Sequence, residues 1–419
     1  MDNNNWDVIY AASAEALNSL LKLNSNTIAF SDSTSVTYSV NKTFDIKVSF
    51  DEFQIVSGGS DKFIVLNLKT NGNINHGEYV YNGLVSRVRM ALTFLETNKA
   101  MGEIRLNCTQ DAIQFIEMDV NGIFPSEQSA ALSVLDKVYT DMIVKHSSKF
   151  SYVFANLNSL NNPLTGIKQF DYSWYQPAGG DCVGFLAVLG VMDDRDILKY
   201  ARIVDSKLLF DSNGSQYDCV YLAAKEQFLR LSMMPALNEK FSDSTQDCFV
   251  IEDGSIRNKS KINLLPFTVG AEFYQPYIDS FDFHIDDNYL VTNLSGKCPI
   301  NGLKDSYVDF TLSAKNSVVY NSSLSRIEFV PDPNMTVTTN KNIPSYVNWV
   351  NILSLNTLNL IIDGVSNAIS NCIKEQLGSY NASTATVGLT SVIWAINVLM
   401  NEGGISDNLY LRGKRIFNL

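Results

Sequence analysis

The sequence predicts an α+β protein built from antiparallel β-sheets. Strand patterns occur in groups joined by short turns rather than alternating singly with helices, and this grouping is typical of α+β folds. Apolar and polar residues alternate strictly from Phe44 to Asp51, as expected for an antiparallel strand with one buried face. Aromatic residues make up 11% of the chain, so the sequence carries enough apolar surface for a folded core.

The first part of the chain is predicted to combine two helices with several strands. A helix is expected from about Trp6 to Leu23, where Ala and Leu are frequent. The alternating strand that begins at Phe44 leads to Ser57-Gly58-Gly59-Ser60, and the strand Phe63–Leu68 then completes a hairpin with a Gly-Gly turn. The remaining elements expected here are strands at Ile104–Cys108, Ile113–Met118 and Ser151–Leu157 and a helix from about Ser126 to His146.

The second part is predicted to contain a buried strand, two helices and a further group of strands. The continuous apolar run Gly184–Met192 indicates a strand that is buried on both faces. Apolar residues at helical spacing predict a long helix over Tyr217–Leu237, with Pro235 kinking or ending its last turn. An amphipathic helix is expected from Tyr346 to Ile373. The strands expected between these helices are Phe281–Asp286, Tyr289–Leu294, Tyr307–Leu312 and Arg326–Val330.

Charge and targeting signals exclude several classes of function. The 32 basic and 44 acidic side chains give a net charge of −12, which argues against nucleic acid as a partner and opposes tight docking to an anionic bilayer. The N-terminus carries no signal-peptide pattern, and the six cysteines show no paired spacing. We therefore expect synthesis in the cytoplasm, with the cysteines as free thiols. The charge-poor segments Ile343–Ile362 and Gln376–Asn401 do not fit a membrane-spanning helix.

The sequence offers little support for catalysis, and no catalytic residue, metal site or cofactor is expected. The three histidines form no zinc motif, and no nucleophile elbow or phosphate-binding loop is present. Acidic residues cluster at positions 193–196 and 279–287, where paired carboxylates can serve glycoside hydrolysis or calcium binding. Asp282 and Asp286 alternate with apolar neighbours, however, so a solvated strand face explains them.

The apolar faces of these helices and strands must be buried against something. Ordinary core packing is one possibility. The other is a channel for an acyl chain, in which each buried methylene contributes about 0.8 kcal/mol. Periodicity does not distinguish the two.

Five segments of the sequence resemble landmarks of one protein family. They are Trp6-Asp7-x-x-Tyr10, Phe53-x-Ile55-x-x-Gly58-Gly59-Ser60, Ser151-Tyr152-Val153-Phe154-Ala155-x-Leu157-Asn158, Phe228-Leu229-x-Leu231-x-Met233-Met234-Pro235-x-Leu237 and Phe329-Val330-Pro331-Asp332-Pro333-Asn334. The family comprises the forty-seven-kilodalton proteins encoded in OrfX-type clusters beside clostridial neurotoxin genes, with relatives near insecticidal toxin genes. The resemblance does not extend to Ser242–Lys261 or Glu375–Leu419.

The resemblance implies the tubular lipid-binding (TULIP) fold, in which strongly curved antiparallel β-sheets wrap around long α-helices. The whole chain, residues 1–419, would form one elongated TULIP-like unit, and a division into two pseudo-repeated halves of about 1–160 and 161–419 stays open. The helix Tyr217–Leu237 would be the wrapped one. Its candidate lipid-groove residues are Val220, Ala224, Phe228, Leu231 and Met234, for which plain core packing is the alternative.

The resemblance also implies a function without catalysis. The protein would be an accessory protein of a neurotoxin- or insecticidal-toxin-associated cluster that binds a lipid or another acyl-chain ligand. Its expected partners are this ligand, other proteins of the cluster and, peripherally, a membrane, and it would be released extracellularly with the toxin complex. Two alternatives stay open: a protein–protein scaffold without lipid, and a membrane-active toxin component whose Tyr346–Ile373 helix inserts into the bilayer.

Overall fold

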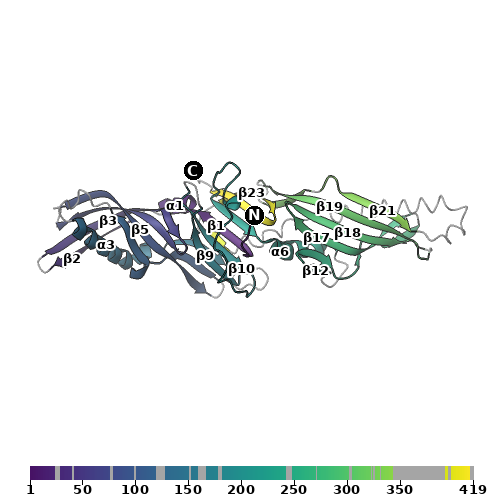
Figure 1. Cartoon of the computed structure of the whole chain (residues 1–419), viewed down its shortest axis with the longest axis horizontal. Coiled ribbons are helices and arrows are strands. Elements are labelled where there is room, and N and C mark those ends of the chain that lie inside the picture. The colour runs from purple at the N-terminus through teal and green to yellow at the C-terminus, as the bar shows by residue number, and fades with distance from the viewer. Residues whose placement is uncertain are drawn as a thin grey trace. The chain divides into compact units, whose positions relative to one another are not determined.

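The computed structural model of the chain divides into two compact units. Unit 1 comprises Met1–Asp2, Leu222–Gly388 and Met400–Leu411, and unit 2 comprises Asn3–Tyr221, Leu389–Leu399 and Arg412–Leu419. Figure 1 shows the elements along the chain. The residues that the structure describes are 1–23, 29–39, 42–75, 79–98, 101–118, 128–150, 152–158, 167–177, 182–241, 248–269, 271–301, 304–321, 323, 326–330, 332–342, 392–394 and 398–415.

Unit 2 contains a large antiparallel sheet with the order β2-β3-β4-β5-β6-β8-β22, in which β7 also pairs with β5. The strands are β2 (Phe30–Ser39), β3 (Lys42–Ser60), β4 (Phe63–Ile74), β5 (Tyr79–Asn98), β6 (Met101–Leu106), β7 (Ile113–Met118), β8 (Val153–Asn158) and β22 (Val392–Trp394). The predicted strands of this region are confirmed. The predicted Gly-Gly turn is wrong, because β3 continues to Ser60 and Gly58, with φ of +107°, lies where the β3–β4 register shifts. Asp61, with φ of +52°, lies between the two strands instead.

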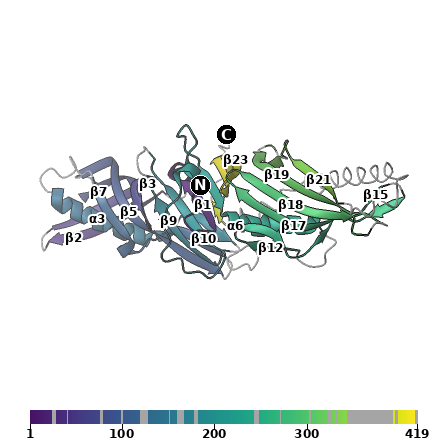
Figure 2. The same ribbon diagram turned by 45° about the vertical axis from the view of Figure 1, so that its right-hand side comes forward.

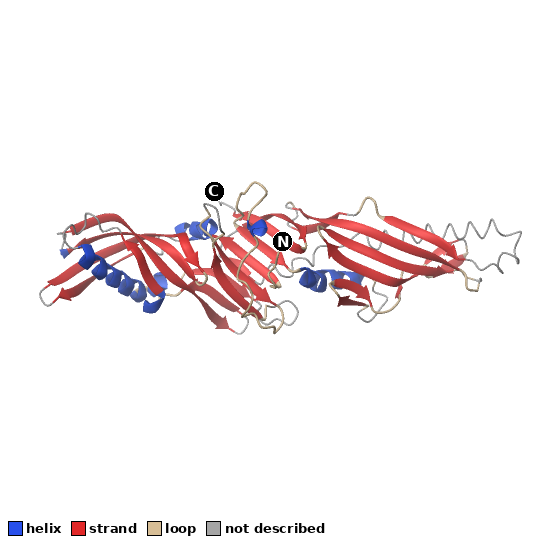
Figure 3. Ribbon diagram, viewed as in Figure 1, coloured by secondary structure: helices blue, strands red, loops and turns tan. Residues whose placement is uncertain are grey.

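The predicted helix Ser126–His146 is confirmed as α3 (Gln128–Lys145), which lies along this sheet (Figures 1 and 3). Its buried side chains recur every three or four residues and form one apolar stripe. They are Val134, Leu135, Val138, Tyr139, Met142 and Ile143. Two short helical elements flank α3, namely η2 (Gln110–Ala112) and α4 (Ser147–Phe150).

Three hydroxyl groups meet inside the apolar contact between α3 and the sheet. The Tyr139 hydroxyl lies 2.8 Å from that of Tyr81 on β5 and 3.0 Å from that of Thr70 on β4. The Tyr139 ring also packs edge-on against Phe50, with centroids 5.3 Å apart. Burial raises the pKa of Tyr139 to about 12, although the two hydrogen bonds oppose the shift. The hydroxyls therefore remain neutral, and they satisfy one another in a core that excludes water.

A second sheet shows that the predicted helix Trp6–Leu23 is wrong in its first half. Val8–Ser13 is a strand, β1, and only Ala14–Leu23 forms a helix, α1. All six residues of β1 are buried, and β1 pairs in antiparallel fashion with β10. A short apolar run buried on both faces has no periodicity that distinguishes strand from helix, which explains the error. The Ser13 hydroxyl oxygen accepts a hydrogen bond from Ala16 N–H at 3.1 Å and so caps the start of α1.

The second sheet has the order β23-β24-β11-β1-β10-β9. Its other strands are β9 (Gln169–Tyr175), β10 (Phe185–Val191), β11 (Cys219–Ala223), β23 (Val398–Ser406) and β24 (Asn408–Arg415). The strand predicted at Gly184–Met192 is confirmed as β10, whose seven residues are all buried. The short helix α5 (Ser206–Leu209) begins at Asp205, whose carboxylate accepts the Lys207 N–H at 2.9 Å.

Unit 1 contains a third large sheet, with the order β12-β13-β17-β18-β19-β20, and its predicted strands are confirmed. Strand β14 also pairs with β17 and β21 with β19, while β15 and β16 form a separate hairpin. The strands are β12 (Phe249–Glu252), β13 (Ser255–Asn258), β14 (Ile262–Asn263), β15 (Phe267–Val269), β16 (Glu272–Tyr274), β17 (Tyr277–Asp286), β18 (Tyr289–Pro299), β19 (Tyr307–Asn321), β20 (Arg326–Val330) and β21 (Thr336–Asn342). The helical elements of unit 1 are described with the candidate site below.

The predicted antiparallel sheets are thus confirmed, but the prediction of long helices is not. Among the described residues, the longest helix is α3 with 18 residues. The predicted amphipathic helix Tyr346–Ile373 lies outside the described residues. No helix in the described ranges has the length and apolar character needed to span a bilayer.

We predict that Tyr139→Phe destabilises unit 2 although the side chain keeps almost the same shape. The substitution removes a hydrogen-bond partner from the buried Tyr81 hydroxyl, which costs about 1–3 kcal/mol. Urea unfolding followed by circular dichroism measures this loss. The double variant Tyr81→Phe/Tyr139→Phe should cost less than the sum of the two single variants, and strictly additive losses would contradict the shared network.

Candidate functional site

The lipid-groove candidates lie on a strand and on three consecutive helical elements, not on one long helix. Cys219–Ala223 is strand β11, so the predicted helix Tyr217–Leu237 is wrong in its first part. The helical elements are α6 (Lys225–Phe228), the π-helical turn η3 (Leu229–Met233) and α7 (Met234–Lys240). As for β1, all five residues of β11 are buried, so the local sequence pattern does not distinguish strand from helix.

The start of α6 is fixed by a residue remote in the sequence. Ala224 has extended backbone angles of φ −56° and ψ 143°, and its own side chain cannot cap a helix. The Lys225 N–H instead donates to the Asn408 side-chain oxygen at 2.8 Å. Because this cap comes from the C-terminal part of the chain, the sequence around residue 225 carries no signal for the helix start.

Pro235 explains the π-helical turn in the middle of this segment. Proline lacks an N–H, and its ring clashes with the carbonyl four residues earlier, here that of Leu231. The turn η3 widens the helix immediately before α7, where Pro235 occupies the first turn. The chain then continues as a helix to Lys240, so Pro235 interrupts the regular α-helix without ending it.

The five candidates differ in burial. Val220 on β11 belongs to unit 2 and is 1% exposed. Ala224 and Phe228, in unit 1, are 7% and 2% exposed. Leu231 and Met234, three residues apart, are only half-buried and therefore form an accessible apolar rim on the helical segment. The prediction that the candidates line a lipid groove stays a prediction.

An aromatic cluster, which the sequence analysis did not identify, joins the end of α7 to the unit 1 sheet. Phe241, Phe249 on β12 and Phe281 on β17 have ring centroids 5.1–6.1 Å apart. The alternation in Phe281–Ile285 indicated that Phe281 would be buried, but nothing in the sequence placed Phe241 beside it. The cluster holds α7 against the apolar face of the sheet.

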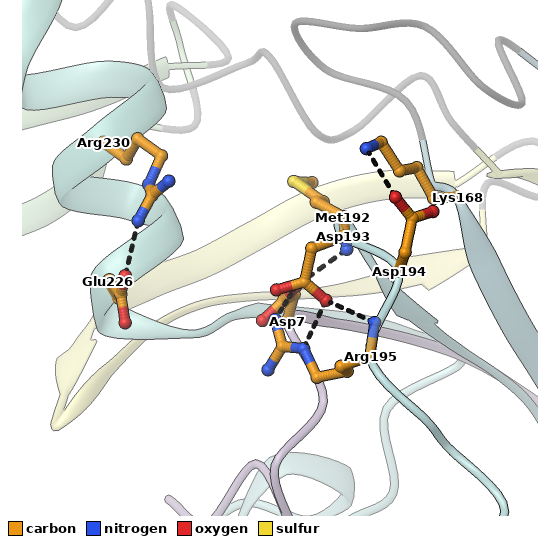
Figure 4. Close-up of polar contacts among 8 residues, drawn as sticks. All are labelled: Asp7, Lys168, Met192, Asp193, Asp194, Arg195, Glu226 and Arg230. Carbon is orange, nitrogen blue, oxygen red and sulfur yellow. Dashed lines mark hydrogen bonds and ion pairs between the residues drawn. The ribbon is translucent and has the colours of Figure 1, made fainter.

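The acidic residues near position 193 form ion pairs rather than a catalytic pair (Figure 4). Asp7 is buried, and its carboxylate accepts hydrogen bonds from Met192 N–H at 2.7 Å and from the Arg195 guanidinium at 2.5 Å. Arg195 also binds Asp193 at 2.6 Å, and Asp194 lies 3.4 Å from Lys168.

In unit 1, Figure 4 shows the exposed pair Glu226–Arg230, 2.6 Å apart on successive helical turns.

The acidic residues of β17 are also paired, and their position on a solvated strand face is confirmed. Asp282 contacts His284 Nδ1 at 2.6 Å and Arg257 Nε at 3.4 Å, while Asp286 lies 3.7 Å from Lys315. The alternating residues Phe281, Phe283 and Ile285 are buried. In the described part of the chain, no group of three or more His, Cys, Asp or Glu side chains is placed to hold a metal ion.

Three open pockets on the described surface are lined mainly by residues with polar side chains, and none is lined by the groove candidates. The largest, about 540 Å³, lies over β2 and β3, and the other two have volumes of about 350 and 360 Å³. The first is lined by Ser33, Thr34, Ser35, Asp45, Ile46, Lys47 and Asn73. Such linings suit water or small polar molecules better than an acyl chain.

Asp32 links the edge strand β2 to the end of α3. Its carboxylate accepts a hydrogen bond from Lys145 Nζ at 2.7 Å and lies 2.8 Å from His146 Nε2. Burial raises the pKa of Asp32, but hydrogen bonds from Lys145, His146 and Ser33 N–H outweigh it and lower the pKa from 3.8 to about 2. Both basic residues lie at the C-terminal end of α3, where the helix dipole also favours positive charge.

The fold places this chain among proteins that are built mostly from antiparallel sheets with short covering helices. The family model for OrfX-like proteins (Protein OrfX2/OrfX3/P47) matches residues 3–410. The chain therefore belongs to the OrfX-like family, which confirms the resemblance seen in the sequence. Protein P47 of Clostridium botulinum (strain Kyoto / Type A2) is 28% identical over 362 residues, covering 80% of this chain and 82% of the relative. Protein OrfX3 of the same strain is 22% identical over 337 residues, covering 68% and 67%.

Two solved structures share this fold. P47 from Clostridium botulinum A2 superposes with a TM-score of 0.78 at 24% identity, covering 99% of this chain and 98% of the other. P47 of Clostridium botulinum E1 gives a TM-score of 0.76 at 21% identity, covering 98% and 99%. At these identities the two matches show a shared fold and nothing beyond it.

We predict that Phe228 and Leu231 differ strongly in their contribution to stability. Phe228→Ala empties a fully buried site and should cost about 3–5 kcal/mol, whereas Leu231→Ala at a half-buried position should cost about 1 kcal/mol. Urea unfolding measures both losses. Equal costs would mean that Leu231 is as tightly packed as Phe228 and forms no accessible rim.

We predict that Asp32 stabilises the fold fully only above about pH 4. Because its folded pKa of about 2 lies below the ordinary value of 3.8, the stabilisation is present above the ordinary value and is lost as the pH falls towards 2. Asp32→Asn should therefore lower the thermal unfolding midpoint at pH 7 but match the wild type near pH 2. The control Asp194→Asn, at an 84% exposed side chain, should change the midpoint little at either pH.

Proposed function

We propose that the protein is a non-enzymatic accessory protein of a bacterial toxin cluster that binds a lipid or another acyl-chain ligand in a TULIP-like interior. The observation that carries this proposal is the half-buried apolar pair Leu231 and Met234 on a helical segment whose remaining apolar residues pack against a sheet. An apolar contact with an accessible edge can admit an acyl chain, since each methylene that leaves water contributes about 0.8 kcal/mol.

The toxin-cluster setting of this proposal rests on membership of the OrfX-like family. Other proteins of that cluster would be its partners, in a neurotoxin- or insecticidal-toxin-associated complex released from the cell. The absence of a catalytic role is supported by the acidic residues at positions 193, 194, 282 and 286, which are engaged in ion pairs. A protein–protein scaffold without lipid is the second candidate, favoured by the polar linings of the three pockets.

We predict that purified protein incubated with mixed phospholipids retains acyl-chain ligands in native mass spectrometry and after solvent extraction. Leu231→Asn/Met234→Asn should lower ligand occupancy about tenfold, because two amides replace the apolar rim. The matched control Glu226→Ala alters an exposed, ion-paired side chain of the same helical segment and should leave occupancy unchanged.

Failure of the wild type to bind any acyl chain would contradict the lipid role. Co-purification with the neighbouring proteins of the cluster would then favour the scaffold. Leakage from liposomes at low pH would instead indicate a membrane-active component.

A further inference from the structure

One end of the unit 1 sheet carries a hairpin with exposed apolar side chains. Strands β15 and β16 pair only with each other among the described strands, with Phe267 opposite Tyr274 and Thr268 opposite Phe273. Figure 2 shows β15 beyond the ends of β17 and β18. Phe273 is 59% exposed and Leu265, just before β15, is 56% exposed. These are large values for residues of their size and apolar character.

Specific contacts hold the hairpin in place. Leu264 N–H donates to the Pro276 carbonyl at 2.9 Å, and the Gln275 amide donates to the Leu264 carbonyl. The Asn301 side chain, just after β18, donates to the Phe273 carbonyl. Tyr274 is buried and stacks on Phe267, with centroids 6.0 Å apart. Because neighbouring residues of a strand point to opposite faces, burial of Tyr274 directs Phe273 outward.

Two tyrosine–lysine pairs lie at the same end of the sheet. Lys261 Nζ lies 4.2 Å from the ring centroid of Tyr277, at the start of β17. Lys297 Nζ lies 4.5 Å from that of Tyr307, at the start of β19. Tyr277 and Lys297 are also direct partners in the β17–β18 register. Tyrosines and lysines behind an apolar end are typical of a membrane interface, where aromatic rings sit at headgroup level and lysine ammonium groups reach water.

The two lysines at this end are paired with carboxylates, and the hairpin itself carries the exposed Glu272 beside Phe273. Lys261 lies 3.6 Å from Asp279, and Lys297 lies 4.0 Å from Asp309. Attraction to anionic lipids therefore does not drive contact, and apolar insertion must supply the affinity. A projecting hairpin with outward Phe and Leu side chains suits a fluid apolar medium, since a protein partner would need a matching pocket.

We propose that the β15–β16 hairpin is the membrane-contacting element of this protein. Phe273 and Leu265 enter the acyl boundary of a zwitterionic bilayer, and Tyr277 and Tyr307, with their lysines, lie at the headgroups. The proposal rests on the lipid-binding role proposed above, because it assigns the surface through which a lipid carrier reaches its lipid source. With only two anchoring side chains, the contact is weak and reversible.

Co-sedimentation of the full chain with phosphatidylcholine vesicles tests this assignment. Phe273→Ser and Leu265→Ser should each lower the partition coefficient about tenfold, since each removes a large apolar anchor. Leu198→Ser is the matched control, because Leu198 is 81% exposed but lies in unit 2, and its binding should equal that of the wild type. Raising the salt from about 0.05 to about 0.5 M should change binding less than about twofold.

Phe273→Trp is the control that distinguishes loss of the apolar anchor from misfolding of the hairpin. This variant keeps an aromatic anchor, so it should bind like the wild type, and its added fluorescence should shift to the blue and be quenched by brominated lipids. The proposal is overturned if the wild type does not bind these vesicles, if the serine variants bind as well as the wild type, or if binding requires anionic lipid. If Phe273→Ser retains acyl-chain ligands, the interior lipid site is separate from the membrane-contacting hairpin. The lipid-binding proposal and the membrane-contact proposal can therefore fail independently.

Discussion

The apolar faces of long antiparallel strands are the constraint on which the rest of this structure depends. Strands β3 and β5 have 19 and 20 residues, longer than any helix among the described residues. Alternation gives such a strand an apolar face that must be kept from water. In unit 2, α3 and α1 both contact this sheet, and in unit 1, α7 contacts β12. Separate helices therefore cover these faces, whereas the family resemblance implied one long wrapped helix.

Most of the fold follows from sequence alternation, and the two strands predicted as helices share one cause. Strands β7 and β20 begin and end where the sequence predicts. The sequence pattern predicts helices at β1 and β11, because both are short apolar runs that prove to be buried on each face. Only their pairing in the second sheet, with partners far along the chain, determines that they are strands.

The candidate site depends on contacts that a local pattern does not contain. Phe228, Leu231 and Met234 are correctly placed on a helical segment, because their spacing reflects one face of it. Val220 is not, since the helix starts only where Asn408 caps the Lys225 N–H. Phe241 and Phe249 pack against each other, and the sequence between them carries no recognisable motif. Side chains that meet through tertiary packing are therefore the part of the site that the sequence does not reveal.

The low charge content of the chain, 18%, follows from how its sheets meet water. Hydroxyl and amide side chains cover the solvent faces and bond across strands, as in Thr311 with Thr338 at 2.5 Å and Ser313 with Asn293 at 2.9 Å. Such pairs satisfy polar groups without the side-chain entropy that long charged residues lose. Against such faces, the hairpin fixed by Asn301 presents the exposed side chains of Phe273 and Leu265. Since the neighbouring faces are already solvated by small polar groups, solubility does not require this exposure, and this is why we propose the hairpin as the membrane-contacting element.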